Sequence, residues 1–379
     1  MTPRTNPVDP DATPRPNRIR PSRTRNAGMR YPRNASKTSP TREASVQPRV
    51  ARSNSEDSVV FKALLLELPE VPETVSFAKD GFSSHSSHAP KVKELEVEHS
   101  KQLHKVVPCP GIMDNLISKL RESLKACRQP SENDPFMSRL SVESRCAHLP
   151  GNICSEHDTE SWVHSAILRP AIAVAQYLIY DDTTTRDFPN TSSVGGPAPV
   201  PDSVVFKLYR DADNAVAAVE FKTHVVLGID WFDAIHKLLA CAQDSPALGS
   251  AAKFHWPDRE DTEFDKATLV LLQVWGQMRN WNVQYGILSS YEHTYFLFKP
   301  QAVSDALYIT NGFKPDNSDL LPATVSFLAL ALGHYSLSDL RLPEPSTEHW
   351  NHASMANFES TGLVPSTYPP RAGNVNRRR

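Results

Sequence analysis

The chain has 379 residues, of which 39% are hydrophobic and 22% charged, with 32 prolines against 14 glycines. That length provides for one large or two ordinary domains, each with its own core. No stretch approaches the roughly 18 to 20 consecutive apolar residues of a membrane span, and the N-terminus lacks the apolar segment of a signal peptide, which excludes an integral membrane protein and a secreted one. Five irregularly spaced cysteines indicate a reducing, intracellular compartment rather than a disulfide framework.

The net charge of -2 conceals an uneven distribution. Residues 1–52 carry about twelve Lys and Arg against about three acidic residues, and residues 371–379 add about four more basic groups. The body between them is therefore acidic. Because counterion release from a phosphate backbone needs clustered cations, we expect any general attraction to nucleic acid to come from the tails.

Composition also divides the chain. Residues 1–56 are rich in Pro, Arg, Ser and Thr and have few aliphatic side chains, which predicts a disordered tail. We expect a helical N-terminal extension at 57–150, the main domain at 151–340 and a Pro-rich basic tail at 341–379. The arginines of residues 15–25 are typical of a nuclear-import or nucleic-acid-contacting arm, which predicts a nuclear location; a merely solvating tail is the alternative.

Hydrophobic periodicity predicts the elements of the body. The helix at 159–180 is expected to begin at Asp158 or Thr159 and to bend at Pro170. In chain order the patterns predict a strand or helix at 58–68, helices at 111–127 and 159–180, strands at 204–209 and 215–223, helices at 231–243 and 266–281, strands at 285–290 and 294–299, an edge strand at 307–310 and a helix at 323–335.

Charged side chains occupy one end of the first predicted hairpin. Asp202 stands at the start of one strand, and Glu220 and Lys222 lie on the next, where residues two apart share a face. The neighbouring side chains are apolar, so these charges are costly unless they are paired or bound to a metal. Two carboxylates beside an ammonium are suited to holding Mg²⁺ against a phosphate. The alternative is a solvated ion pair on an exposed strand face.

These residues carry a resemblance to a known superfamily. Pro201-Asp202 followed by Glu220-Phe221-Lys222 resembles the PD-(D/E)XK nuclease signature, and the region from 156 to 335 is similar to fungal proteins with a PD-(D/E)XK nuclease-like domain. The resemblance implies an α/β fold with a restriction-endonuclease-like core, a mixed β-sheet flanked by helices. It implies Asp202 and Glu220 as metal ligands and Lys222 as the group that positions or deprotonates the attacking water.

Two further residues follow from the same resemblance. Glu160 matches the acidic residue that many members carry on the first core helix, which implies a third metal ligand. Gln273 resembles the glutamine of the RecB-like branch, in which a tyrosine usually follows four residues later; Gln277 stands there instead. Asp202, Glu220, Lys222, Glu160 and Gln273 are therefore the predicted catalytic residues.

The implied activity is hydrolysis of nucleic-acid phosphodiesters with Mg²⁺ or Mn²⁺, with DNA and RNA equally open as substrates. The alternative is a catalytically inactive nuclease fold that serves as a protein-interaction scaffold, which the acidic body favours. Motifs for nucleotide triphosphatases, kinases, nicotinamide enzymes, zinc proteases and serine hydrolases are absent from the sequence.

Overall fold

The computed structural model describes most of the chain between residues 57 and 342, and these residues belong to one compact unit. Within that span the description leaves out 67, 71–72, 75–94, 132, 142–145, 185–186, 196–198, 209–211, 228–251, 255, 258–265, 301–304 and 341. The two predicted tails, apart from Leu342, and the helix predicted at 231–243 therefore lie outside the described residues.

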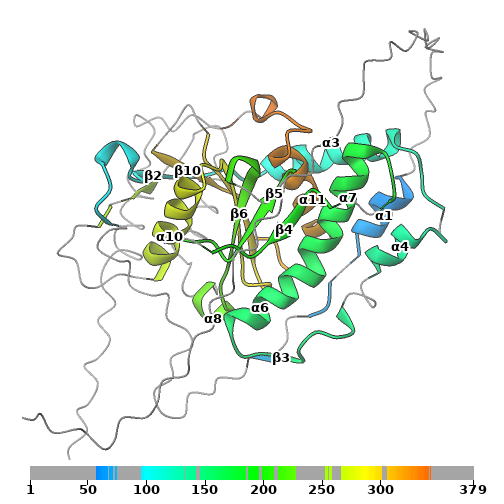
Figure 1. The fold of residues 1–379 in the computed structure, drawn as a ribbon, viewed down its shortest axis with the longest axis horizontal. Helices are drawn as coiled ribbons and strands as arrows, with labels where there is room; N and C mark the ends of the chain where they lie inside the picture. The colour runs from blue at the N-terminus through cyan, green and yellow to red at the C-terminus, as the bar shows by residue number, and fades with distance from the viewer. Residues whose placement is uncertain are drawn as a thin grey trace, which may run out of the picture. The chain divides into compact units, whose positions relative to one another are not determined.

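A mixed sheet of eight strands forms the centre of the unit (Figure 1). β6 pairs in parallel with β8, and β10 in parallel with β2, whereas the other neighbours are antiparallel. The strand order is β4 (Asn190–Ser192), β5 (Ser203–Phe206), β6 (Ala215–Phe221), β8 (Tyr285–Ser289), β9 (Thr294–Phe298), β10 (Ala306–Ile309), β2 (Lys105–Pro108) and β7 (Ala252–Lys253). The predicted α/β class with a mixed sheet is confirmed.

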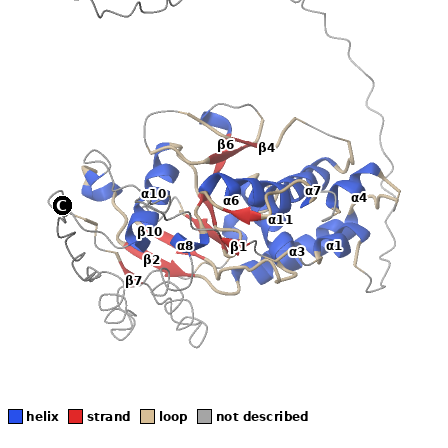
Figure 2. Ribbon diagram, turned by 90° about the horizontal axis from the view of Figure 1, so that it is seen from below, coloured by secondary structure: helices blue, strands red, loops and turns tan. Residues whose placement is uncertain are grey.

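Helices cover both faces of this sheet. α10 (Lys266–Asn280) lies on one face, while α3 (Ile112–Ala126), α7 (Arg169–Tyr180) and α11 (Leu320–Ala331) pack together on the other (Figures 1 and 2). The remaining elements are α1 (Val59–Leu64), β1 (Glu73–Thr74), η1 (His99–Lys101), α4 (Pro135–Leu140), β3 (Asn152–Ile153), α6 (Glu156–Trp162), η2 (Val163–Leu168), η3 (Ala212–Asn214), α8 (His224–Leu227) and η4 (Leu337–Asp339).

The alternation of side chains along β6 separates two hydrophobic layers. Val219 and Phe221 belong to the core shared with α3, α7 and α11, whereas Ala218 belongs to the core beneath α10. Successive strand residues point to opposite faces, so Glu220 lies on the α10 side. Each layer is closed by large buried rings, Phe296 and Phe298 on one side and Trp275 on the other. The sheet is thus buried on both faces, and a charge on β6 has little access to water.

The helix after residue 155 begins earlier than the sequence predicts. Ser155 is the N-cap, and its side chain accepts a hydrogen bond from the Asp158 N–H, so α6 starts at Glu156. A π-helical segment, η2, then joins α6 to α7 without a break, and Pro170 follows it as the second residue of α7. The early start places Glu156 on the first turn.

The strand predicted at 307–310 is present as β10 (Ala306–Ile309), but its predicted edge position is wrong, because β10 is an interior strand. It pairs with β9 on one side and with β2 on the other, in the register Leu307 with Val106. The segment 57–150 therefore contributes a strand of the central sheet as well as helices, and α3 from the same segment packs on α11. Among the helices of the described residues, none has the length and apolarity needed to cross a membrane.

Candidate active site

The β5–β6 hairpin brings the predicted carboxylates together. Ser203 pairs with Val219, which places Asp202, just before β5, beside the end of β6. Asp202 Oδ2 accepts a hydrogen bond of 2.8 Å from the Phe221 N–H. Because a backbone donor fixes this oxygen, the carboxylate is held at the end of the β5–β6 strand pair, next to Glu220.

Glu220 is the centre of a buried polar cluster. Its side chain is 1% exposed and accepts hydrogen bonds at both oxygens. Oε1 accepts from Lys222 Nζ and from Gln273 Nε2, and Oε2 accepts from Gln277 Nε2 at 2.6 Å. The structure brings together Glu220, Lys222 and Gln273, three of the residues that the sequence analysis selected, and Gln273 contacts the glutamate rather than the lysine. Gln277, in place of the tyrosine of the resembled branch, makes an equally direct contact.

A second carboxylate reaches Lys222 from the helix layer. Glu156 Oε1, on the first turn of α6, lies 3.4 Å from Lys222 Nζ. The lysine side chain is 4% exposed and the Glu156 side chain 43% exposed, so the pair spans from the sheet to the surface. Sequence reasoning selected Glu160 on this helix and missed Glu156. Both acids lie near the start of the helix, one turn apart, and nothing in the pattern ranks one above the other.

α10 also fixes the segment that leads into Asp202. Gln277 Nε2 donates to the Val200 carbonyl at 3.1 Å, and Asn280 Nδ2 donates to the Pro199 carbonyl at 3.2 Å. Gly276 permits this close approach, since a Cβ atom there would lie 2.9 Å from Pro199 Cγ. One face of α10 therefore contacts both Glu220 and the approach to Asp202.

Burial dominates the protonation of the two carboxylates. Burial is the main cause that raises the pKa of Glu220 to about 7. The charge of Asp202 also acts to raise this pKa, and Lys222 acts to lower it. Burial also raises the pKa of Asp202, more than Lys222 and the Phe221 N–H lower it, and Glu156 and Glu160 add to the rise. Burial acts to lower the pKa of Lys222, but Glu220, Glu156 and Asp202 outweigh it, so that pKa is raised. Lys222 is therefore an ammonium ion at neutral pH.

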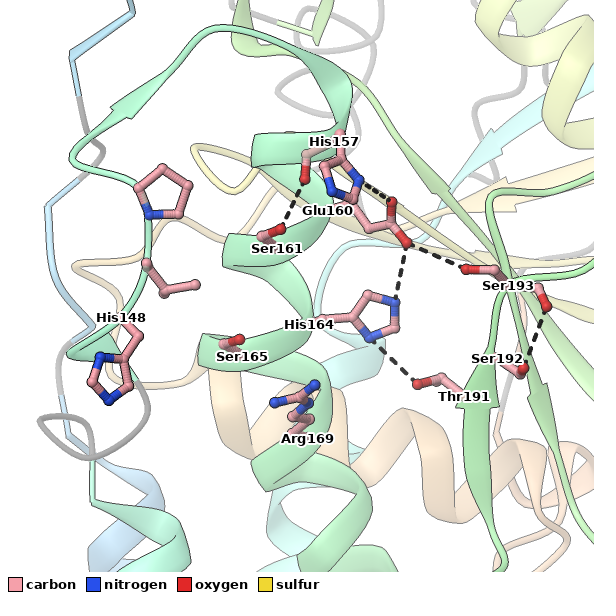
Figure 3. Close-up of a pocket in the computed structure, with 12 residues that line it drawn as sticks. His148, His157, Glu160, Ser161, His164, Ser165, Arg169, Thr191, Ser192 and Ser193 are labelled. Carbon is pink, nitrogen blue, oxygen red and sulfur yellow. Dashed lines mark hydrogen bonds and ion pairs between the residues drawn. The ribbon is translucent and has the colours of Figure 1, made fainter.

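Glu160 lies apart from the Glu220 cluster. Its carboxylate contacts His157 Nδ1 at 3.2 Å and His164 Nε2 at 3.9 Å, and accepts a hydrogen bond of 3.4 Å from Ser193 Oγ (Figure 3). It lines a polar cavity between α6 and β4. Its charge still acts on Asp202, whose pKa it raises. Glu160 as a metal ligand stays a prediction.

A divalent cation at this cluster would need oxygen ligands from its carboxylates. Among the described residues, no group of three or more His, Cys, Asp or Glu side chains is placed to hold a metal ion. Mg²⁺, however, is usually held by one or two carboxylates, with water and substrate phosphates completing its shell. Asp202 and Glu220 supply two, and Glu220 uses about three of the roughly four acceptor sites of a carboxylate. The residues fit Mg²⁺ on this count.

The cluster also contains a buried amide oxygen. Gln277 Oε1 makes no hydrogen bond to any part of the chain that the structure describes. Since buried polar groups are normally satisfied by protein, water or ligand, this atom is consistent with a site that takes up a further group.

Comparisons of the chain with protein-family models, with curated proteins and with solved structures give no match. The functional argument therefore depends on the site geometry.

Proposed function

We propose that this chain is a metal-dependent phosphodiesterase of the PD-(D/E)XK type that hydrolyses nucleic acid with Mg²⁺ or Mn²⁺, on a restriction-endonuclease-like core formed by α6–α7, β4–β6, α10 and β8. The observation that carries the proposal is the convergence of Asp202, Glu220 and Lys222 at one end of the β5–β6 hairpin. Burial is the main cause of the raised pKa values of both carboxylates, and a divalent cation held between them would offset the cost of burying their charges.

Asp202 and Glu220 are the residues that would hold the cation, which when bound supplies charge neutralisation at the phosphate and acidifies water. The chain contributes fixed orientation: the Phe221 N–H holds Asp202, and Gln273 and Gln277 hold Glu220. Preorganised groups of this kind need no rearrangement during the reaction.

Lys222 acts as a cation in this proposal. Glu220 and Glu156 keep it protonated, so it donates a hydrogen bond to the oxygen of the attacking water, whose proton is released to bulk water, and it stabilises the negative charge that develops on the phosphate. Of the two roles that the resemblance implies for this lysine, the geometry favours positioning over proton abstraction. Glu156 is a positioning residue, since it acts through Lys222.

A second candidate function is the inactive nuclease fold that serves as a protein-interaction scaffold. The observation that favours it is the occupancy of Glu220, whose two oxygens already bind one ammonium and two amides. A satisfied buried network of this kind also specifies a unique core without any catalysis. The two functions differ in whether a metal ion enters the cluster.

The test is a cleavage assay on the full chain with single-stranded DNA, double-stranded DNA and RNA in Mg²⁺ or Mn²⁺. Lys222→Met removes the ammonium and keeps much of the side-chain volume, and we expect a loss of at least about 100-fold in the cleavage rate. Lys105→Met is the matched control: Lys105 lies on β2 of the same sheet and pairs with Asp305 at 3.2 Å, away from the cluster.

Cleavage that needs the metal, falls in Lys222→Met and persists in Lys105→Met supports the proposal. Absence of cleavage of all three substrates by a folded wild-type chain contradicts it and favours the scaffold. Equal loss in both lysine variants also contradicts it, because the effect is then on folding or general charge.

A further inference from the structure

A polar cavity of about 580 Å³ has α6 and η2 on one wall and β4 on the other (Figure 3). This volume is within the range of about 300 to 1,000 Å³ of pockets that bind small molecules. Hydroxyl, imidazole and guanidinium side chains dominate its lining. The groups used below are His157, Glu160, His164, Arg169, Thr191 and Ser193.

The single carboxylate of the lining is already engaged by its neighbours. Glu160 contacts the rings of His157 and His164 and accepts a hydrogen bond from the Ser193 hydroxyl, so three lining groups share its charge. His164 is also tied to β4, since its Nδ1 lies 3.4 Å from Thr191 Oγ1. The two walls are thereby held together, and the cavity is built before any ligand enters.

Arg169 supplies a positive charge to the cavity lining. It lies at the start of α7, one to two turns after His164, and is exposed. Within the described part of the chain its guanidinium makes no hydrogen bond or ion pair, although its charge lowers the pKa of His164. A guanidinium beside several hydroxyl groups is the arrangement that binds phosphate oxygens.

The cavity is connected to the proposed active site by two routes. His164 packs on Phe221 with ring centroids 5.4 Å apart, and the Phe221 N–H binds Asp202. On the same helix, Glu156 binds Lys222 one turn before Glu160. Glu160 on the cavity wall is therefore one helical turn from the residue that pairs with Lys222.

We infer that this cavity binds one phosphorylated nucleotide of a single strand, adjacent to the scissile bond, with the phosphate on Arg169 and the β4 hydroxyls. The inference rests on the proposed function, which supplies the strand. The His157 ring, whose side chain is 83% exposed, is available for stacking on the base. The cavity is larger than a phosphate ion requires, which favours a whole nucleotide over an isolated anion.

The test is fluorescence anisotropy of a labelled thymidine tetranucleotide on the full chain, in EDTA so that no cleavage occurs. We expect Arg169→Gln to weaken binding about tenfold, which corresponds to about 1.4 kcal/mol, and Thr191→Val to weaken it as well. Arg128→Gln, at an exposed arginine outside the cavity, is the matched control and is expected to change binding less than about twofold. A methylphosphonate tetranucleotide, which lacks the backbone charges, is expected not to bind.

Equal weakening by the two arginine substitutions overturns the inference, because the attraction is then unspecific. Absence of binding by a folded wild-type chain, or binding of the methylphosphonate strand with equal affinity, also overturns it. Competition by inorganic phosphate as strong as by thymidine monophosphate overturns the nucleotide assignment. Specific binding in EDTA without cleavage in Mg²⁺ supports the nucleotide-binding cavity and contradicts the proposed function. Cleavage in Mg²⁺ that Arg169→Gln leaves intact, together with no binding of the tetranucleotide in EDTA, supports the proposed function and contradicts the nucleotide-binding cavity.

Discussion

Replacing Glu220 with glutamine removes a buried carboxylate whose pKa is raised to about 7, mainly by burial. Its ordinary value is 4.5, so between these pH values the folded state binds more protons than the unfolded state does. The free energy of unfolding therefore falls as pH rises through this window. A shift of this size is worth roughly 3 kcal/mol, most of which develops between about pH 5 and about pH 8.

The assay is urea unfolding of the wild type and Glu220→Gln, followed by tryptophan fluorescence in EDTA at constant ionic strength across that pH range. The quantity of interest is the difference in unfolding free energy between the two proteins. Other groups, such as His164 and His334, titrate in both proteins and largely cancel. The pKa of Lys222 is raised above 10.5, outside the window.

We expect the wild type to lose about 2 to 3 kcal/mol relative to Glu220→Gln as the pH rises. The offset between the two proteins at a single pH is not informative, because the substitution also weakens the contact with Lys222. A difference that stays constant with pH would refute the assignment of a raised pKa to Glu220, and with it the argument that a cation offsets the cost of burying this charge.

Further predictions concern the surroundings of the cluster. Gly276→Ala places a Cβ atom 2.9 Å from Pro199 Cγ, so we expect a loss of about 1 to 3 kcal/mol in urea unfolding and weaker metal binding, since the segment before Asp202 must shift. Gln277→Leu deprives Glu220 Oε2 and a backbone carbonyl of their donor, and should cost about 2 to 3 kcal/mol. Cys109 is 3% exposed and its thiol pKa is raised by burial, so we expect alkylation by iodoacetamide only after denaturation, as peptide mass spectrometry would detect.

Local patterns in the sequence predict the local elements well. The helical spacing of apolar residues in 111–127 matches α3, and the alternation in 285–299 matches the β8–β9 hairpin. These elements depend on contacts between residues a few positions apart, which periodicity records. The position of β10 in the sheet cannot be predicted in this way. Its partner β2 lies about 200 residues earlier in the chain, and parallel pairing over that distance leaves no local signal.

The candidate site shows the same division. Glu220 and Lys222 are two apart on one strand, and the hairpin turn brings Asp202 to them, so all three follow from short-range structure. Glu156 and Glu160 lie on one helix face, and only the docking of α6 on the sheet decides which of them reaches Lys222. The sequence does not determine the role of Gln277, because its contact with Glu220 depends on the rotation of α10 about its axis.

The most direct test of the central claim, that Asp202 and Glu220 hold a divalent cation, is calorimetric titration of Mg²⁺ and Mn²⁺ into the full chain. The account predicts one binding event in the wild type, its loss in Asp202→Asn and its retention in Lys222→Met, since the lysine is not a ligand. Absence of binding in a folded wild type, or binding that Asp202→Asn leaves unchanged, would contradict it.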